Sequence, residues 1–323
     1  MFLRSLLLTL LLSMPAAAQV PRVAADIGPV HSLVARVMDG VDVPALILPP
    51  AASPHGHALR PSEARTIENA EVVFWIGPEL EPWLDDAIGA LAPDARSVAL
   101  VPRATEHEEH DGHEEHDGHD EHDGHEEHDG HEEHHDHEEH DAHHGHDDGH
   151  DHARLHAWLD PLTGKAWLDT ISEVLAALDP ENAVIYEANA EAGRAELDAL
   201  SSRLEKIVAP VRDRGFIVFH DGFGAFEDRF AIPSHGAIQP SEATPPSAAD
   251  VVALRDEIVS GDVVCVFSEP QYNAGLVRTL IEGTEARTGV LDPLGTLIPT
   301  GKDLYPALLE NLARALASCL SGD

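Results

Sequence analysis

Short apolar runs alternate with stretches of helical periodicity along most of this 323-residue chain. In the first third, this pattern predicts strands at 23–27, 43–48, 72–76 and 97–101, and helices at 30–37, 62–69 and 83–91. The run VVFWI at 72–76 is apolar at every position, as expected of a strand buried on both faces. Because buried strands that alternate with helices form parallel sheets, we predict an α/β lobe here.

The same alternation returns after residue 210, where it predicts strands at 216–219, 263–267 and 288–291, and helices at 250–258, 274–283 and 305–320. We therefore predict a second α/β lobe. The pattern gives no strand order for either sheet. Ahead of this lobe, Asp160 and Pro161 suit the N-cap and the first position of a further helix.

A long helix is predicted from Pro180 to about Val208. At about 1.5 Å per residue, its roughly 28 residues would span some 40 Å. Such a helix can run the length of the molecule and join the two lobes. Its predicted apolar stripe consists of Ile185, Ala188, Ala192, Ala195, Leu200, Leu204 and Ile207.

The first residues have the three parts of a secretory signal peptide. Arg4 precedes an apolar core at 5–12, which is too short to span a bilayer, and small residues at 16–18 provide a cleavage site. We predict a signal peptide at 1–18, an N-terminal lobe at 19–179 that contains a loop at 105–152, a linking helix at 180–209 and a C-terminal lobe at 210–323.

Composition changes abruptly at residues 106–152, which hold 18 of the 24 histidines and 22 of the 59 acidic residues. This His-rich run lacks the apolar surface needed to offset the entropy of ordering, so we predict that it is disordered when free. Its composition predicts metal binding, because neutral imidazole is a common ligand for zinc and copper. Without its 22 acids the formal charge of −39 becomes −17. Neither part has a basic patch, so nucleic acid is excluded as a partner.

Three of the six histidines outside the run share one setting. His55 and His220 follow predicted strands, and His156 lies just ahead of a predicted helix. Asp292 also follows a strand. In open parallel sheets ligands gather outside the carboxyl ends of the strands, and three imidazoles with one carboxylate fit a tetrahedral zinc site.

The other three histidines carry weaker signals. For His31 and His235 we favour packing or simple surface exposure. His57 lies two residues from His55, and in an extended segment both side chains would point the same way. A supporting or gating role for His57 and no role at all are equally compatible with the sequence. His220 and Asp221 are accompanied by no GxSxG elbow and no activated cysteine, so we predict that the protein is not an enzyme.

Six motifs resemble the periplasmic zinc-binding proteins of ABC-type zinc uptake systems, the ZnuA family: SPHGHALRPSE, WIGPELEPWL, LHAWLDP, FIVFHDGFGAFE, CVFSEPQ and TGVLDPLGT. The resemblance covers nearly the whole mature chain and includes an acidic His-rich insertion at the same place. It implies two Rossmann-like lobes with parallel sheets, bridged by a long helix, with zinc held between the lobes.

Carried over position by position, the resemblance implies that His55, His156 and His220 bind zinc and that Asp292 completes the site. Pro54 stands where some relatives have an acidic residue, so the fourth ligand is left open among Asp292, a water and a side chain of the His-rich run. Glu269 and Arg60 match motifs that frame the cleft, where we interpret them as structural or supporting groups.

The two cysteines, Cys265 and Cys319, favour a disulfide in an exported chain over a pair of metal ligands, since neither has CxxC spacing. The resemblance implies the same pairing. It also implies a periplasmic, monomeric protein that delivers Zn²⁺ to an inner-membrane permease with its cytoplasmic ATPase, with a periplasmic zinc chaperone as a further candidate partner.

We interpret the His-rich run as an auxiliary collector or sensor of zinc, and the alternative is a solvated spacer that binds metal incidentally. Its candidate ligands are His107, His110, His113, His116, His119, His122, His125, His128, His131, His134, His137 and His140. The alternatives for the whole protein are uptake of manganese or iron, metal-dependent hydrolysis, and simple metal buffering.

Overall fold

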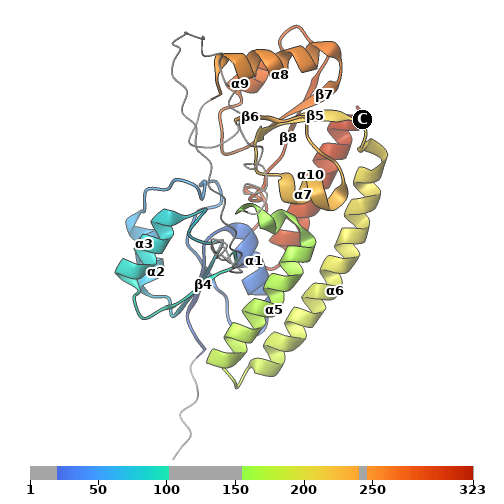
Figure 1. Cartoon of the computed structure of the whole chain (residues 1–323). Helices are drawn as coiled ribbons and strands as arrows, with labels where there is room; N and C mark the ends of the chain where they lie inside the picture. Colours follow the sequence, from blue (N-terminus) through green and yellow to red (C-terminus); the bar gives the residue numbers. More distant parts are fainter. Residues whose placement is uncertain (1–19, 102–154, 240–245, 323) are drawn as a thin grey trace, which may run out of the picture.

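Two four-stranded parallel sheets organise the computed structural model, which describes residues 20–101, 155–239 and 246–322 (Figure 1). The first has the order β2-β1-β3-β4 and the second the order β6-β5-β7-β8. The strands of the first are β1 (Val23–Ala25), β2 (Ala45–Leu46), β3 (Val72–Trp75) and β4 (Arg96–Ala99). Those of the second are β5 (Gly215–His220), β6 (Ala237–Gln239), β7 (Val263–Ser268) and β8 (Arg287–Val290). The predicted α/β class is therefore confirmed.

The first sheet is covered on both faces. Its helices are α1 (Gly28–Val37), α2 (Pro61–Glu68) and α3 (Pro82–Leu91). On β3, Val73 and Trp75 pack with α2 and α3, whereas Val72 and Phe74 face the cluster that contains α1. This period of two explains why the run VVFWI is apolar throughout, since alternate residues enter two different cores.

The second sheet follows the same plan. The helices α8 (Ala248–Ser260) and α9 (Gly275–Ile281) cover one face, where Ile217 of β5 and Val266 of β7 are buried. The helices α7 (Gly224–Phe230) and α10 (Leu304–Ser321) contribute to the other face, which belongs to the same hydrophobic cluster as α1. A single core therefore passes between the two sheets.

Two long helices, α5 (Pro161–Leu178) and α6 (Ala183–Val208), contribute to this core, and α6 extends alongside both sheets (Figure 1). Asp160 caps α5 as predicted, because its carboxylate accepts a hydrogen bond of 2.8 Å from the Leu162 N–H. Short 3-10 turns at Ala157–Leu159 (η1) and Ala209–Val211 (η2) flank the pair.

The predicted stripe of α6 was wrong in its first half. Ile185 is 41% exposed, and the buried positions are Tyr186, Ala190, Gly193, Leu197, Leu200, Leu204 and Val208. The buried face is set by the neighbouring helices, chiefly α5, against which Gly193 lies so close that a Cβ would be 2.8 Å from Leu168. The Tyr186 hydroxyl donates to Asp179 at 2.8 Å, which satisfies its polar end inside the core.

The disulfide between Cys265 and Cys319 is present and links β7 to α10. None of the helices in the described ranges is both long and apolar enough to cross a membrane. The predicted signal peptide at 1–18 and the twelve auxiliary histidines from His107 to His140 lie outside the described residues. The division into lobes at 19–179 and 210–323 stays a prediction.

Candidate metal centre

Three imidazoles from separate parts of the chain meet between the two sheets. His55 lies in the loop that joins β2 to α2, His156 directly precedes η1, and His220 is the last residue of β5. Their ring nitrogens lie within 4.8 Å of one another, and they form the one such group of His, Cys, Asp and Glu side chains in the described residues. The three histidines chosen from the sequence are thus brought together.

The contacts between these rings suit a bound cation. The His156 Nε2 atom lies 3.1 Å from Nε2 of His55 and 3.2 Å from Nε2 of His220. One proton on His156 Nε2 can satisfy only one of these contacts, whereas a cation accepts all three lone pairs. Zn–N bonds of 2.0–2.1 Å in a tetrahedral site would place the ligand nitrogens about 3.3 Å apart. The observed spacing needs little adjustment to reach this value.

The space beside the three rings is very small. The hollow lined by the histidines, Trp158, Tyr272 and Leu294 measures about 10 Å³. That is room for one water or ion, far below the roughly 300 Å³ or more of pockets for organic ligands. His156 and His220 are 2% and 5% exposed, so their lone pairs are shielded from water.

Glu269, just beyond β7, orients the ring of His220. Its Oε1 atom lies 2.6 Å from Nδ1 of His220 and also accepts the His220 backbone N–H at 3.2 Å. A proton on Nδ1 therefore leaves Nε2 unprotonated and directed at the other histidines. Burial raises the pKa of Glu269, and its hydrogen bonds with His220 oppose that rise. Carboxylate–histidine pairs of this kind fix metal ligands in zinc proteins.

Comparison with known proteins gives a consistent result. The family model of ZnuA, the periplasmic component A of the zinc-uptake complex, matches residues 23–319. The high-affinity zinc uptake system protein ZnuA of Brucella suis biovar 1 is 47% identical over 309 residues, covering 93% of this chain and 91% of that protein. The protein of the same name from Paracoccus denitrificans is 45% identical over 313 residues, covering 96% and 95%. The chain belongs to the ZnuA family.

Solved structures support the fold. A zinc-bound deletion mutant of ZnuA superimposes with a TM-score of 0.70 at 22% identity, covering 94% of this chain and 98% of that one. The periplasmic zinc-binding protein TroA from Treponema pallidum gives a TM-score of 0.71 at 18% identity, covering 93% and 99%. The ZnuA-family fold, with two parallel sheets and a bridging helix, is therefore the fold of this chain.

Asp292 does not join the three histidines in this ZnuA-family chain. Its Oδ2 atom accepts the Thr296 backbone N–H at 2.6 Å, and its Oδ1 atom accepts from the Leu294 and Gly295 backbones and from the side chains of Gln271 and Thr296. These bonds make its carboxylate the organising centre of the loop at 292–296. Its role as the fourth ligand stays a prediction.

The other histidines have different surroundings. His31 is buried in α1 with Nε2 3.0 Å from the Pro44 carbonyl oxygen, and burial lowers its pKa. His235 is partly exposed beside Glu257. His57 lies beside Glu63 rather than among the three ligands. Packing and exposure therefore account for His31 and His235 as the sequence favoured.

Two aromatic residues that the sequence did not single out support the His156 segment. The Trp158 indole N–H donates to the Pro293 carbonyl at 2.8 Å, which ties this segment to the Asp292 loop. The Tyr305 hydroxyl of α10 donates to the Trp158 carbonyl at 2.7 Å. Trp158 in LHAWLDP was visible beside a candidate ligand, whereas Tyr305, far along the chain, carried no local signal.

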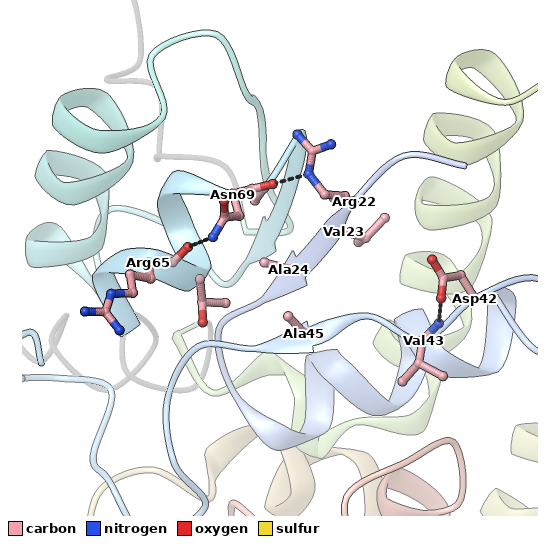
Figure 2. A pocket seen from close by; sticks show the side chains of 10 residues that line it. Arg22, Val23, Ala24, Asp42, Val43, Ala45, Arg65 and Asn69 are labelled. Atoms are coloured by element: carbon pink, nitrogen blue, oxygen red, sulfur yellow. Dashed lines mark hydrogen bonds between the residues drawn. The ribbon is translucent and has the colours of Figure 1, made fainter. Parts of the chain in front are cut away.

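A larger hollow of about 350 Å³ lies away from the histidines, beside the starts of β1 and β2 and the end of α2 (Figure 2). Arg22 and Arg65 line it together with one carboxylate, Asp42. The Arg22 guanidinium donates to the Asn69 carbonyl, as the dashed line in Figure 2 shows. Two guanidinium groups and one acid are a poor ligand set for a cation, so size alone does not identify the metal site.

Proposed function

We propose that this protein captures Zn²⁺ in the periplasm at His55, His156 and His220, and delivers it to the permease of an ABC-type zinc importer. The observation that carries the proposal is the convergence of three Nε2 atoms in a hollow of single-ion size. Membership of the ZnuA family supports zinc as the cargo. The protein makes and breaks no covalent bond in this role.

The ligand set also bears on selectivity. Three imidazole nitrogens suit zinc better than manganese, which prefers oxygen ligands. Copper(II) would outrank zinc in intrinsic affinity, so binding of copper in vitro does not identify the cargo. A hydrolytic reaction would need space for an organic substrate next to the metal, and the hollow of about 10 Å³ does not favour it.

The test is zinc affinity and stoichiometry in His55→Ala, His156→Ala and His220→Ala, with His235→Ala as the matched surface control. Each ligand variant should lose more than about 100-fold in affinity, because even outer contacts of zinc sites are worth about 10–100-fold. The control should bind as the native chain does. Tight binding that survives all three ligand substitutions would refute the site.

The finer parts of the proposal concern regions and partners beyond the three histidines. The chain carries a cleaved signal peptide, acts as a monomer, and meets the permease and its ATPase, with a periplasmic zinc chaperone as a further partner. The His-rich run collects or senses zinc. Zinc titration of the full chain and of a deletion of 106–150 tests the last point. Loss of only weaker binding phases supports it, and loss of the tight phase contradicts the site between the sheets.

A further inference from the structure

The three histidines differ in their burial and in the secondary structure around them. His220 ends a buried strand and His156 lies at the start of η1, and both are buried. His55 is half-buried and lies in the irregular segment between β2 and α2. Its neighbour Gly56 has no other atom within 4 Å of the position that a Cβ would take, so little packing restrains the loop there. Beside the contacts of His55 itself, such as its backbone N–H to Ser53 Oγ at 3.3 Å, the residues on either side help to fix its position.

One tryptophan contacts both sides of His55. The Trp83 indole N–H, on α3, donates to the Pro54 carbonyl oxygen at 2.8 Å. The same indole packs against the imidazole of His57, with the ring centroids 5.3 Å apart. Trp83 thus fixes the backbone before His55 and the side chain two residues after it.

A residue of α2, Glu63, also holds the His57 side chain in place. The His57 Nε2 atom lies 2.7 Å from Oε2 of Glu63, and the two side chains are only 9% and 6% exposed. The same Oε2 atom accepts the Arg60 backbone N–H at 2.7 Å, which closes the first turn of α2. A shielded carboxylate with two donors is stable in this position, and it anchors His57 to the start of a helix.

We propose that Trp83, His57 and Glu63 form a clamp that positions His55 for zinc and thereby sets the affinity of the site without binding the metal. The clamp explains why a histidine two residues from His55 contacts Glu63 through Nε2 and is not among the three grouped histidines. This inference rests on the proposed zinc-binding function. Groups hydrogen-bonded directly to zinc ligands are worth about 10–100-fold in affinity, and a clamp that acts through the neighbouring residues should fall at the lower end of that range.

The experiment compares His57→Ala, His57→Gln and Trp83→Phe in the full chain. In His57→Gln the new side-chain amide could donate to Glu63 in place of the imidazole Nε2, so this variant is the conservative rescue. Trp83→Phe keeps a ring against His57 but removes the donor to Pro54. Trp75→Phe is the matched control, because the Trp75 indole N–H donates to Ser97 Oγ at 2.9 Å and not to the loop that carries His55.

Zinc affinity is measured by competition with a chelator, zinc release by stopped flow, and ligand geometry by the visible absorption of bound Co²⁺. We expect His57→Ala and Trp83→Phe to weaken zinc binding about 10-fold or more through faster release, with one tight ion still bound. His57→Gln should recover most of the loss, and Trp75→Phe should stay within about twofold. If His57→Ala does not fold without metal, His57→Gln and Trp83→Phe decide the question.

Unchanged affinity in both His57→Ala and Trp83→Phe would overturn the clamp. A His57→Ala variant whose Co²⁺ spectrum shows a lost nitrogen ligand, as in His55→Ala, would make His57 a ligand and would overturn it too. If His55→Ala itself leaves zinc binding intact, the proposed zinc site fails, whatever the clamp variants show. The two failures are therefore distinguishable.

Discussion

Reduction of the disulfide between Cys265 and Cys319 is a direct test of how the C-terminal sheet is held to the shared core. The two cysteines are 54 residues apart in sequence, and they link β7 to α10. In the chain-entropy account, a closed loop of this length constrains the unfolded state by about 4 kcal/mol at 25 °C. Since α10 packs in the cluster that spans both sheets, the loss should affect the whole molecule.

The measurement is urea unfolding of the zinc-free protein in its oxidised and reduced forms, followed by circular dichroism. The same chain is compared with itself, so no substituted side chain contributes to the difference. The reduced form should be less stable by about 4 kcal/mol. The double variant Cys265→Ala/Cys319→Ala, which reductant cannot change, is the control. A difference below about 1 kcal/mol would refute the entropic account for this loop.

Individual side chains give three further predictions. Zinc affinity should fall as pH drops through the histidine range near 6.5, because the three imidazoles must be unprotonated to bind the metal, and chelator competition at several pH values measures this. Burial raises the pKa of Glu227 from 4.5 to about 7, despite the opposing hydrogen bonds from Ser234. A raised carboxyl pKa favours the folded state below the unfolded value, and that contribution is lost as pH rises through 7. Glu227→Gln can keep both Ser234 bonds, since both reach one oxygen, and should be more stable than the native chain at pH 8 by up to about 3 kcal/mol in urea unfolding. Finally, Asp292→Ala should lower the melting temperature of the zinc-free protein, because it leaves the backbone N–H groups of the loop at 292–296 without their acceptor. An unchanged melting temperature there would contradict the loop-centre role of Asp292.

The local sequence pattern was sufficient to predict most strands and most helices, and it failed where tertiary packing determines the buried face or the element itself. The run at 72–76 fills two cores at once, so its strand character was visible in composition alone. The face of α6 could not be assigned in the same way, because Ala188 and Ala190 are equally apolar and only the packing of α5, α10 and α1 against this helix decides which is buried. The strand β6 at 237–239 and the helix α7 were missed, since both are short and are held by β5 and by the shared core.

Candidate ligands were easier to predict than the residues that hold those ligands in position. His220 ends β5 and His156 directly precedes η1, whereas His55 lies in the loop between β2 and α2. The short motifs around all three are visible in the local sequence. The residues that position the ligands come from distant parts of the sequence. Glu269 is 49 residues from His220, and Trp83 is 29 residues from Pro54. A single sequence does not reveal such pairs, because nothing in the local pattern around Trp83 refers to the loop it holds.

The His-rich run and the site between the sheets supply metal ligands in different ways. A run in which histidine recurs about every three residues supplies many equivalent ligand sets. Binding is tighter when the ligands are ordered before the metal arrives, since otherwise the metal must offset that entropy. At the site, strand β5, the turn η1 and the contacts of Trp83 each order one histidine in advance. Affinity in this chain should therefore follow the rigidity of three side chains rather than the number of histidines that the sequence contains.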